Sequence, residues 1–158
     1  MKIGIYPGTF DPVTNGHLDI LTRASKLFDK IIVGVAVDSD KNTLFPIEER
    51  LDFIKDAVAD MPNIEVESFS GLLMHFTESK EANVIIRGLR AVSDFEYEFQ
   101  LALMNKNLNE SVETIFLTTS SEYTFLSSTI IKSVVKLDGE IKGLVPKKVE
   151  LALKAIYK

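Results

Sequence analysis

Short apolar, β-branched runs alternate along the chain with segments whose apolar residues recur at helical spacing. The short runs are typical of buried strands, and they fall at residues 2–6, 31–37, 64–68, 84–87 and 114–117. The segments with helical spacing predict helices at residues 16–28, 47–59, 71–80, 93–107, 127–136 and 146–157. Alternating strands and helices build βαβ units, so we predict an α/β fold, namely a Rossmann-like doubly wound sheet of five parallel strands with helices on both faces.

Composition and charge exclude several classes of protein. A chain of 158 residues with 46% hydrophobic content can bury a substantial core, and we expect a single domain over residues 1–158. The net charge of −5 argues against indiscriminate nucleic-acid binding, which needs a broad basic face. Cysteine is absent, which excludes disulfides, thiolate nucleophiles and cysteine-bound zinc. The apolar runs are too short to span a membrane and the N-terminus begins a strand, so we expect a cytoplasmic protein without a membrane partner.

The loop between the first predicted strand and helix carries the first candidate chemistry. In an open α/β sheet, ligands gather beyond the carboxyl ends of the strands. Gly8 and Gly16 let the backbone approach an anion at the helix N-terminus, and Thr9 offers a hydroxyl donor. His17 falls in the first helical turn and could face the same anion. Ordinary turn residues beside a surface or core histidine would produce the same pattern, so both interpretations stay open at this point.

Cations and hydroxyls follow the other strands. Lys41 follows the second strand, and Arg87 and Arg90 follow the fourth. Arginine forks suit phosphate oxygens because they donate paired N–H bonds. The alternatives are that Lys41 is solvated, that Arg90 is a surface residue and that Arg87 pairs with a carboxylate. The hydroxyl-rich run before the predicted helix 127–136 could bind phosphates or simply cap that helix.

Three motifs together resemble one family. The run Pro-Gly-Thr-Phe-Asp-Pro followed by Thr-Asn-Gly-His, at residues 7–17, resembles the (His or Thr)-x-Gly-His signature of the nucleotidyltransferase superfamily, in the form of its phosphopantetheine adenylyltransferase branch. The run Arg-Gly-Leu-Arg-Ala at residues 87–91, joined to residues 93–100, resembles the same branch. Residues 126–129 are similar to its Ile-Ser-Ser-(Ser or Thr) motif, from which Leu126 and Thr129 depart conservatively.

The resemblance implies an enzyme of coenzyme A biosynthesis. It would transfer the adenylyl group of ATP to 4′-phosphopantetheine, giving 3′-dephospho-CoA and pyrophosphate. A phosphate monoester is already largely anionic at neutral pH, so the attack needs no general base. The enzyme has to align two anions and stabilise the charge that builds on the attacked phosphorus. Mg²⁺ would be the cofactor, held mainly by ATP phosphates and water and by no dedicated protein ligands.

The resemblance also implies residue roles and partners. Catalytic roles go to Thr9, His17, Lys41 and Arg90, with His17 as a donor that stabilises the transition state. Phosphopantetheine contacts are expected at Thr9, Lys41, Leu73 and Arg87. ATP contacts are expected at Thr9, Phe10, His17, Gly88, Leu89, Arg90, Glu98, Tyr123, Thr124, Phe125, Leu126, Ser127, Ser128 and Thr129. A homo-oligomer, hexameric in this family, and feedback binding of CoA are further expectations.

Several features have plainer interpretations. Phe95, Phe99 and Leu103 fit a core-facing stripe of the helix predicted at 93–107. Glu98 could be a solvated helix residue, and His75 has no motif support, so we interpret it as structural or surface. One rival function is an adenylyl- or cytidylyltransferase acting on nicotinamide mononucleotide or a small alcohol phosphate. Another is a nucleotide-sensing module without turnover.

Overall fold

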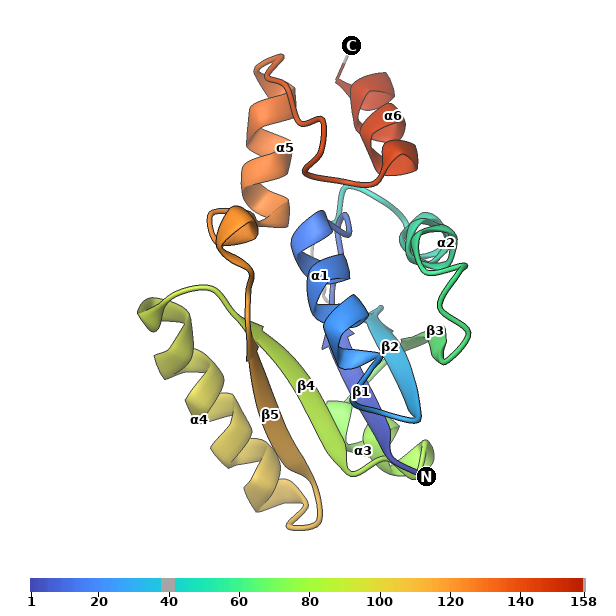
Figure 1. Ribbon diagram of the computed structural model, residues 1–158, viewed down its shortest axis with the longest axis vertical. Coiled ribbons are helices and arrows are strands. Elements are labelled where there is room, and N and C mark those ends of the chain that lie inside the picture. Colours follow the sequence, from blue (N-terminus) through green and yellow to red (C-terminus); the bar gives the residue numbers. More distant parts are fainter. Residues whose placement is uncertain (38–41, 158) are drawn as a thin grey trace.

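The computed structural model describes residues 1–37 and 42–157. Its centre is a sheet of five parallel strands in the order β3-β2-β1-β4-β5 (Figure 1). The strands are β1 (Ile3–Gly8), β2 (Lys30–Ala36), β3 (Ile64–Phe69), β4 (Val84–Leu89) and β5 (Glu113–Thr118). All five predicted strands are therefore confirmed. The order reverses at β1, because β2 lies on one side of it and β4 on the other.

β1 and β4 extend two residues further toward their carboxyl ends than predicted. Pro7 and Gly8 stay in β1 because they lie in register with Gly34 and Val35 of β2. β4 likewise continues to Leu89, which lies in register with Thr118 of β5. Neighbouring strands therefore carry residues of low strand propensity into the sheet.

The predicted helices are also present. They are α1 (Asn15–Ala24), α2 (Ile47–Ala57), α3 (Leu73–Ser79), α4 (Val92–Leu108), α5 (Ser128–Lys136) and α6 (Lys147–Ile156). The first helix ends four residues earlier than predicted, because the backbone turns after Ala24 and Asp29 already bonds to Lys2 at the start of the sheet. A short 3-10 turn at Ser121–Tyr123 was not predicted.

Side chains of successive strand residues point to opposite faces of the sheet. Tyr6, Val33 and Ile86 join the main core with α1 and α2. Ile5 and Ile85 point the other way and pack with residues of α3. The inner strands β1, β2 and β4 are buried on both faces, which explains their nearly continuous apolar runs. The edge strand β3 instead carries Glu65 and Glu67. The two packed faces confirm the doubly wound architecture.

The prediction for α4 was wrong in one respect. Phe95, Phe99 and Leu103 were interpreted as a core-facing stripe, but all three are exposed. α4 packs against β4 and β5 at one edge of the sheet, where Phe95 reaches Phe116. A single sheet edge can cover only one side of this helix, and α4 carries apolar residues around most of its circumference.

The last two helices lie beyond the carboxyl edge of the sheet (Figure 1). Ile131 and Val135 of α5 belong to the same core as Val149 and Leu153 of α6. The N-terminus of α5 consequently faces the ends of β1 and β4. Among the described residues, no helix combines the length and the hydropathy needed to cross a bilayer.

Candidate active site

A pocket of about 410 Å³ lies where the strand order reverses. Open α/β sheets bind ligands at this position, beyond the carboxyl ends of the strands. The pocket is bounded by β1, β4, the N-termini of α1 and α5, and one face of α4. Its lining residues are Tyr6, Pro7, Gly8, Thr9, Phe10, Thr14, Gly16, His17, Ile20, Arg87, Gly88, Arg90, Asp94, Tyr97, Glu98, Thr119, Tyr123, Leu126, Ser127 and Ser128.

His17 is fixed by the way in which α1 begins. Thr14 is the N-cap, and its hydroxyl accepts from the backbone N–H of His17. The His17 ring returns the contact, because Nδ1 accepts the backbone N–H of Thr14 at 2.9 Å. This is a capping box in which an imidazole takes the place usually held by Glu or Gln. Helix initiation thus sets both the position and the orientation of the ring.

The same contact fixes the chemistry of the imidazole. A nitrogen that accepts an N–H bond carries no proton, so neutral His17 has its proton on Nε2. Burial lowers the pKa of His17 from 6.5 to about 4, and the positive charges of Arg90 and Arg87 add to this effect. At neutral pH the ring is therefore an uncharged donor. It is well suited to stabilise a developing negative charge and poorly suited to act as a base.

Phe10 forms the wall behind His17. Its ring lies edge-on to the His17 ring, with the centroids 4.9 Å apart. The Phe10 backbone has φ 51°, which is unusual for a bulky residue and brings the ring back over the loop. Gly8 is required beneath it, because a Cβ there would lie 2.9 Å from the Phe10 ring.

A second chamber of about 440 Å³ adjoins the first and shares Thr9, Phe10, His17 and Ser128 with it. Asp11, Asn42, Thr43, Thr129 and Lys132 complete its lining. Lys132 of α5 pairs with Asp11 at 3.1 Å. Sequence reasoning missed Asp11 and Lys132. The signal for Lys132 was its place three residues after Thr129, one helical turn along the same face.

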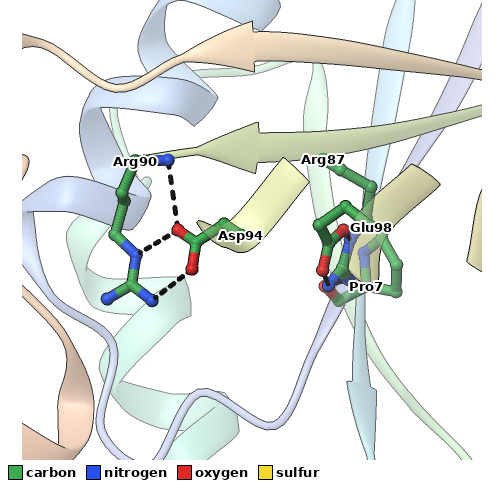
Figure 2. A network of polar contacts seen from close by, with 5 residues as sticks. All are labelled: Pro7, Arg87, Arg90, Asp94 and Glu98. Atoms are coloured by element: carbon green, nitrogen blue, oxygen red, sulfur yellow. Dashed lines mark hydrogen bonds and ion pairs between the residues drawn. The ribbon is translucent and has the colours of Figure 1, made fainter. Parts of the chain in front are cut away.

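Arg87 and Glu98 form a bidentate ion pair beside the pocket (Figure 2). Arg87 Nε and Nη2 donate to the two carboxylate oxygens of Glu98 at 2.5 and 2.8 Å, and Nη1 donates to the Pro7 carbonyl at 3.1 Å. Burial alone would lower the pKa of Arg87, but the bonds and charge of Glu98 outweigh it and raise the pKa. The alternative that Arg87 pairs with a carboxylate is therefore observed. Because Glu98 is that carboxylate and its side chain is only 11% exposed, Glu98 is not a solvated helix residue.

Arg90 is held at the other side of the pocket (Figure 2). Its Nε donates to Asp94 at 3.0 Å, and its Nη1 donates to the carbonyl of Leu126 at 3.0 Å. The second bond joins the end of β4 to the segment before α5. Arg90 therefore helps to hold that segment at the pocket mouth while its charge faces the same space as His17.

The N-terminus of α5 meets the loop between β1 and α1. Ser127 is the N-cap and accepts the N–H of Ile130, so the capping alternative is observed for this hydroxyl. Ser128 donates to the carbonyl of Pro12 at 2.8 Å. Thr129 lines the second chamber. Two helix N-termini, those of α1 and α5, thus converge on one space, which favours an anionic ligand.

The remaining predicted contacts are distributed unevenly. Gly88, Tyr123 and Leu126 line the first chamber. Leu89, Thr124 and Phe125 are not among the residues that line either chamber, and Phe125 is exposed. Their ATP contacts stay predictions.

Neither Leu73 nor His75 lines these two chambers. Leu73 lines a separate cavity of about 40 Å³, on the far side of the Arg87–Glu98 pair. Lys41 lies outside the described residues. His75 is exposed, which confirms its interpretation as a surface residue.

The fold and the site together define an α/β protein of the nucleotide-binding class, and comparisons with known proteins agree with this class. A model of the cytidylyltransferase-like family matches residues 5–134. The solved structure of a Vibrio parahaemolyticus protein assigned as a nicotinate-nucleotide adenylyltransferase superposes with a TM-score of 0.71, covering 98% of this chain and 93% of the other at 18% identity. At that identity the likeness shows the fold alone.

Closer relatives narrow the family. A phosphopantetheine adenylyltransferase of Clostridium tetani is 60% identical over 92% of this chain and 91% of its own length. One of Moorella thermoacetica is 55% identical over 99% of this chain and 98% of its own length. The chain belongs to the phosphopantetheine adenylyltransferase family, within the wider cytidylyltransferase-like class.

Proposed function

We propose that this protein transfers the adenylyl group of ATP to 4′-phosphopantetheine, giving 3′-dephospho-CoA and pyrophosphate. The observation that carries the proposal is the neutral Nε2–H donor of His17, fixed by a capping box where two helix N-termini converge. The family of the chain supplies the identity of the two substrates.

The reaction is an in-line displacement at the α-phosphorus of ATP. A phosphate oxygen of phosphopantetheine forms the new P–O bond, and the bond to the β-phosphate breaks and leaves its electron pair on pyrophosphate. His17 donates from Nε2 to the charge that builds on the α-phosphate. Thr9, with Lys41, holds the attacking phosphate. The protein contributes position and electrostatic stabilisation, and no general base is required.

The ATP polyphosphate lies against the N-terminus of α5, near Ser128 and Thr129, with Arg90 at the pocket mouth. Arg90 is paired with Asp94 in the structure, so an incoming phosphate has to compete with that carboxylate. In the proposed complex the pantetheine arm extends toward Leu73, past the Arg87–Glu98 pair, and the small cavity that these three residues line supports this direction.

Mg²⁺ would be held mainly by the phosphates of ATP and by water. Among the described residues, no group of three or more His, Asp or Glu side chains could hold a metal ion. Asp11, an acidic residue on the second chamber, already accepts from Leu44, Phe45 and Lys132. The donors present thus fit a metal that arrives with ATP and its waters, where it offsets charge on the leaving pyrophosphate.

We further propose a homo-oligomer, hexameric as in the family, with a cytoplasmic location and feedback binding of CoA. The exposed apolar residues of α4 support the assembly. They are Phe95, Phe99, Leu103, Met104 and Leu108, together with Tyr97 and Leu101, which also line cavities beside the helix. A helix that is apolar around most of its circumference is usually covered, and a second copy of this chain would cover it.

One assay separates this function from its rivals. Purified protein, Mg²⁺ and ATP are mixed with phosphopantetheine, nicotinamide mononucleotide or glycerol phosphate, and pyrophosphate release is followed. Of the three acceptors, we expect only phosphopantetheine to cause pyrophosphate release. Release only with one of the other acceptors would assign a different transferase, and ATP binding without release would assign a sensing module.

The assembly has its own test. Leu103→Glu puts a charge on the exposed face of α4, and Leu151→Glu puts the same charge on an exposed leucine of α6. We expect light scattering to show smaller particles for Leu103→Glu and unchanged particles for Leu151→Glu. A monomeric wild-type protein would contradict the proposed assembly.

A further inference from the structure

Arg50 is a buried arginine behind the β1–α1 loop. It lies in the first turn of α2 and is only 3% exposed. Its hydrogen bonds to described residues all go to backbone carbonyl oxygens. Nε donates to Phe45 at 3.0 Å, and Nη1 donates to Thr9 at 2.8 Å and to Ala36 at 3.1 Å. Burying a guanidinium is costly, so a residue that only filled space would be expected to be apolar.

The three carbonyls belong to three different parts of the chain. Thr9 follows β1, Ala36 ends β2, and Phe45 precedes α2. The guanidinium therefore joins the ends of two neighbouring strands and the entrance to a helix at one point. A planar fork can donate in several fixed directions at once, which a lysine ammonium on a flexible stem does less well.

Asp11 makes the reciprocal connection. Its carboxylate accepts the backbone N–H groups of Leu44 at 2.7 Å and Phe45 at 2.9 Å. Arg50 thus reaches from the α2 side into the loop, and Asp11 reaches from the loop toward the α2 side. Burial lowers the pKa of Arg50, while the negative charges of Asp11 and Glu48 oppose that effect.

Phe10 lies between the two anchored residues. Its left-handed backbone is unfavourable for a non-glycine residue and persists only where the surroundings fix it. Arg50 holds the carbonyl of Thr9 on one side of Phe10, and the Asp11 carboxylate is held on the other. The ring that this turn places lies against His17.

We propose that Arg50 is a positioning residue for adenylyl transfer. It holds Thr9 and Phe10 in the left-handed turn that presents the Thr9 side chain to the attacking phosphate and supports the His17 ring. Arg50 itself touches no substrate. The inference rests on the proposed function, because Thr9 is its point of action.

The principal test compares Arg50→Met with Lys55→Met, an exposed lysine on the same helix. Both variants are assayed with ATP and phosphopantetheine well below their unfolding temperatures. A displacement of about 1 Å can cost on the order of a hundredfold in rate. We expect kcat to fall about tenfold to a hundredfold in Arg50→Met, with the KM for ATP changed less than about threefold, and no change in Lys55→Met.

A cycle with Thr9→Ala distinguishes positioning from general stability. If Arg50 acts through Thr9, then Thr9→Ala loses most of its effect on kcat/KM in the Arg50→Met background. An equal fold-loss in both backgrounds would overturn the inference. Should Arg50→Met not fold, Arg50→Lys carries the test, with an expected loss of about threefold to tenfold, and wild-type kcat in that variant would contradict the proposal.

The outcomes also separate the inference from the function on which it rests. Wild-type protein that releases no pyrophosphate with phosphopantetheine removes the proposed function. Active wild-type protein with a folded, fully active Arg50→Met variant removes only the role of Arg50.

Discussion

Two regions line the pocket, and they prepare for an anion in different ways. In the β1–α1 loop, the capping box with Thr14 engages Nδ1 of His17 and leaves the Nε2–H as a donor. In the β4–α4 segment, the arginines are charged but already paired, Arg87 with Glu98 and Arg90 with Asp94. The first region therefore holds a hydrogen-bond donor whose position is already fixed. The second holds cations that have to exchange a carboxylate for a phosphate.

This difference assigns the two regions different tasks. A preset donor costs no reorganisation at the moment of reaction, so it suits the transition state. A paired cation can attract a phosphate only by giving up a carboxylate, so it suits recognition of the bound substrate. We therefore expect substitutions in the first region to change kcat and substitutions in the second to change KM or stability.

The largest effect is expected at His17. Removing one donor of this type costs about a hundredfold to a thousandfold in rate. His17→Ala should lower kcat by that factor, while the Kd for ATP measured by calorimetry changes little. His75→Ala, at an exposed histidine, is the matched control and should be fully active. Equal losses in ATP binding and turnover would assign His17 to ground-state binding instead.

The pH dependence of stability is the next largest effect. His17 has a pKa of about 4 in the folded protein and about 6.5 when unfolded, so the unfolded chain binds more protons between these values. The contribution of neutral His17 to the unfolding free energy is complete above pH 6.5 and is lost as the pH falls toward 4. Between pH 7.5 and 4.5 it amounts to about 2–3 kcal/mol of unfolding free energy.

Urea titrations at pH 7.5 and 4.5 measure this loss of unfolding free energy. His17→Gln keeps the capping box, since Gln is a usual partner there, but has no titrating ring. The wild-type protein should lose more stability on acidification than His17→Gln by that amount. Identical losses in the two proteins would show that the pKa of His17 is ordinary.

The Arg87–Glu98 pair should contribute a smaller but clear amount to stability. The Glu98 side chain is 11% exposed and that of Arg87 is 30% exposed, so removing the carboxylate leaves a poorly solvated cation. We expect Glu98→Gln to lower the unfolding free energy by about 2 kcal/mol, measured by urea denaturation. Glu96→Gln, on the exposed side of α4, should change it by less than about 0.5 kcal/mol.

The smallest effect is expected at Asp94, whose pair with Arg90 is more exposed, at 27% and 40%. Asp94→Asn should change the unfolding free energy by less than about 0.5 kcal/mol. It should also lower the KM for ATP about twofold to threefold, because Arg90 no longer has to leave a carboxylate. A raised KM would show that Asp94 serves ATP binding by placing Arg90.

The sequence predicted the sheet well because its inner strands β1, β2 and β4 are buried on both faces. Their apolar runs need no long-range information to recognise, whereas the carboxyl ends of β1 and β4 at Gly8 and Leu89 depend on pairing with neighbours. The orientation of α4 could not be predicted, because a helix with apolar residues on most sides has no periodic signal to separate core from surface.

The site was predictable only as far as local motifs extend. His17 and its loop lie in one short run, so the motif placed them. Asp11 bonds to residues 33 and 34 positions away, Arg50 to Thr9 across 41 positions, and Lys132 to Asp11 across 121. A single sequence does not mark such pairs. Only Lys132 had a local signal, its place one helical turn after Thr129, and its pairing with Asp11 became visible only through the fold.

The protonation state of His17 tests the central claim most directly. Nitrogen-15 NMR of the histidine rings, recorded from pH 3.5 to 8, reports both the tautomer and the pKa. We predict that His17 carries its proton on Nε2 at pH 7 and titrates near pH 4. A proton on Nδ1, or a midpoint near 6.5, would contradict the assignment of His17 as a preset neutral donor.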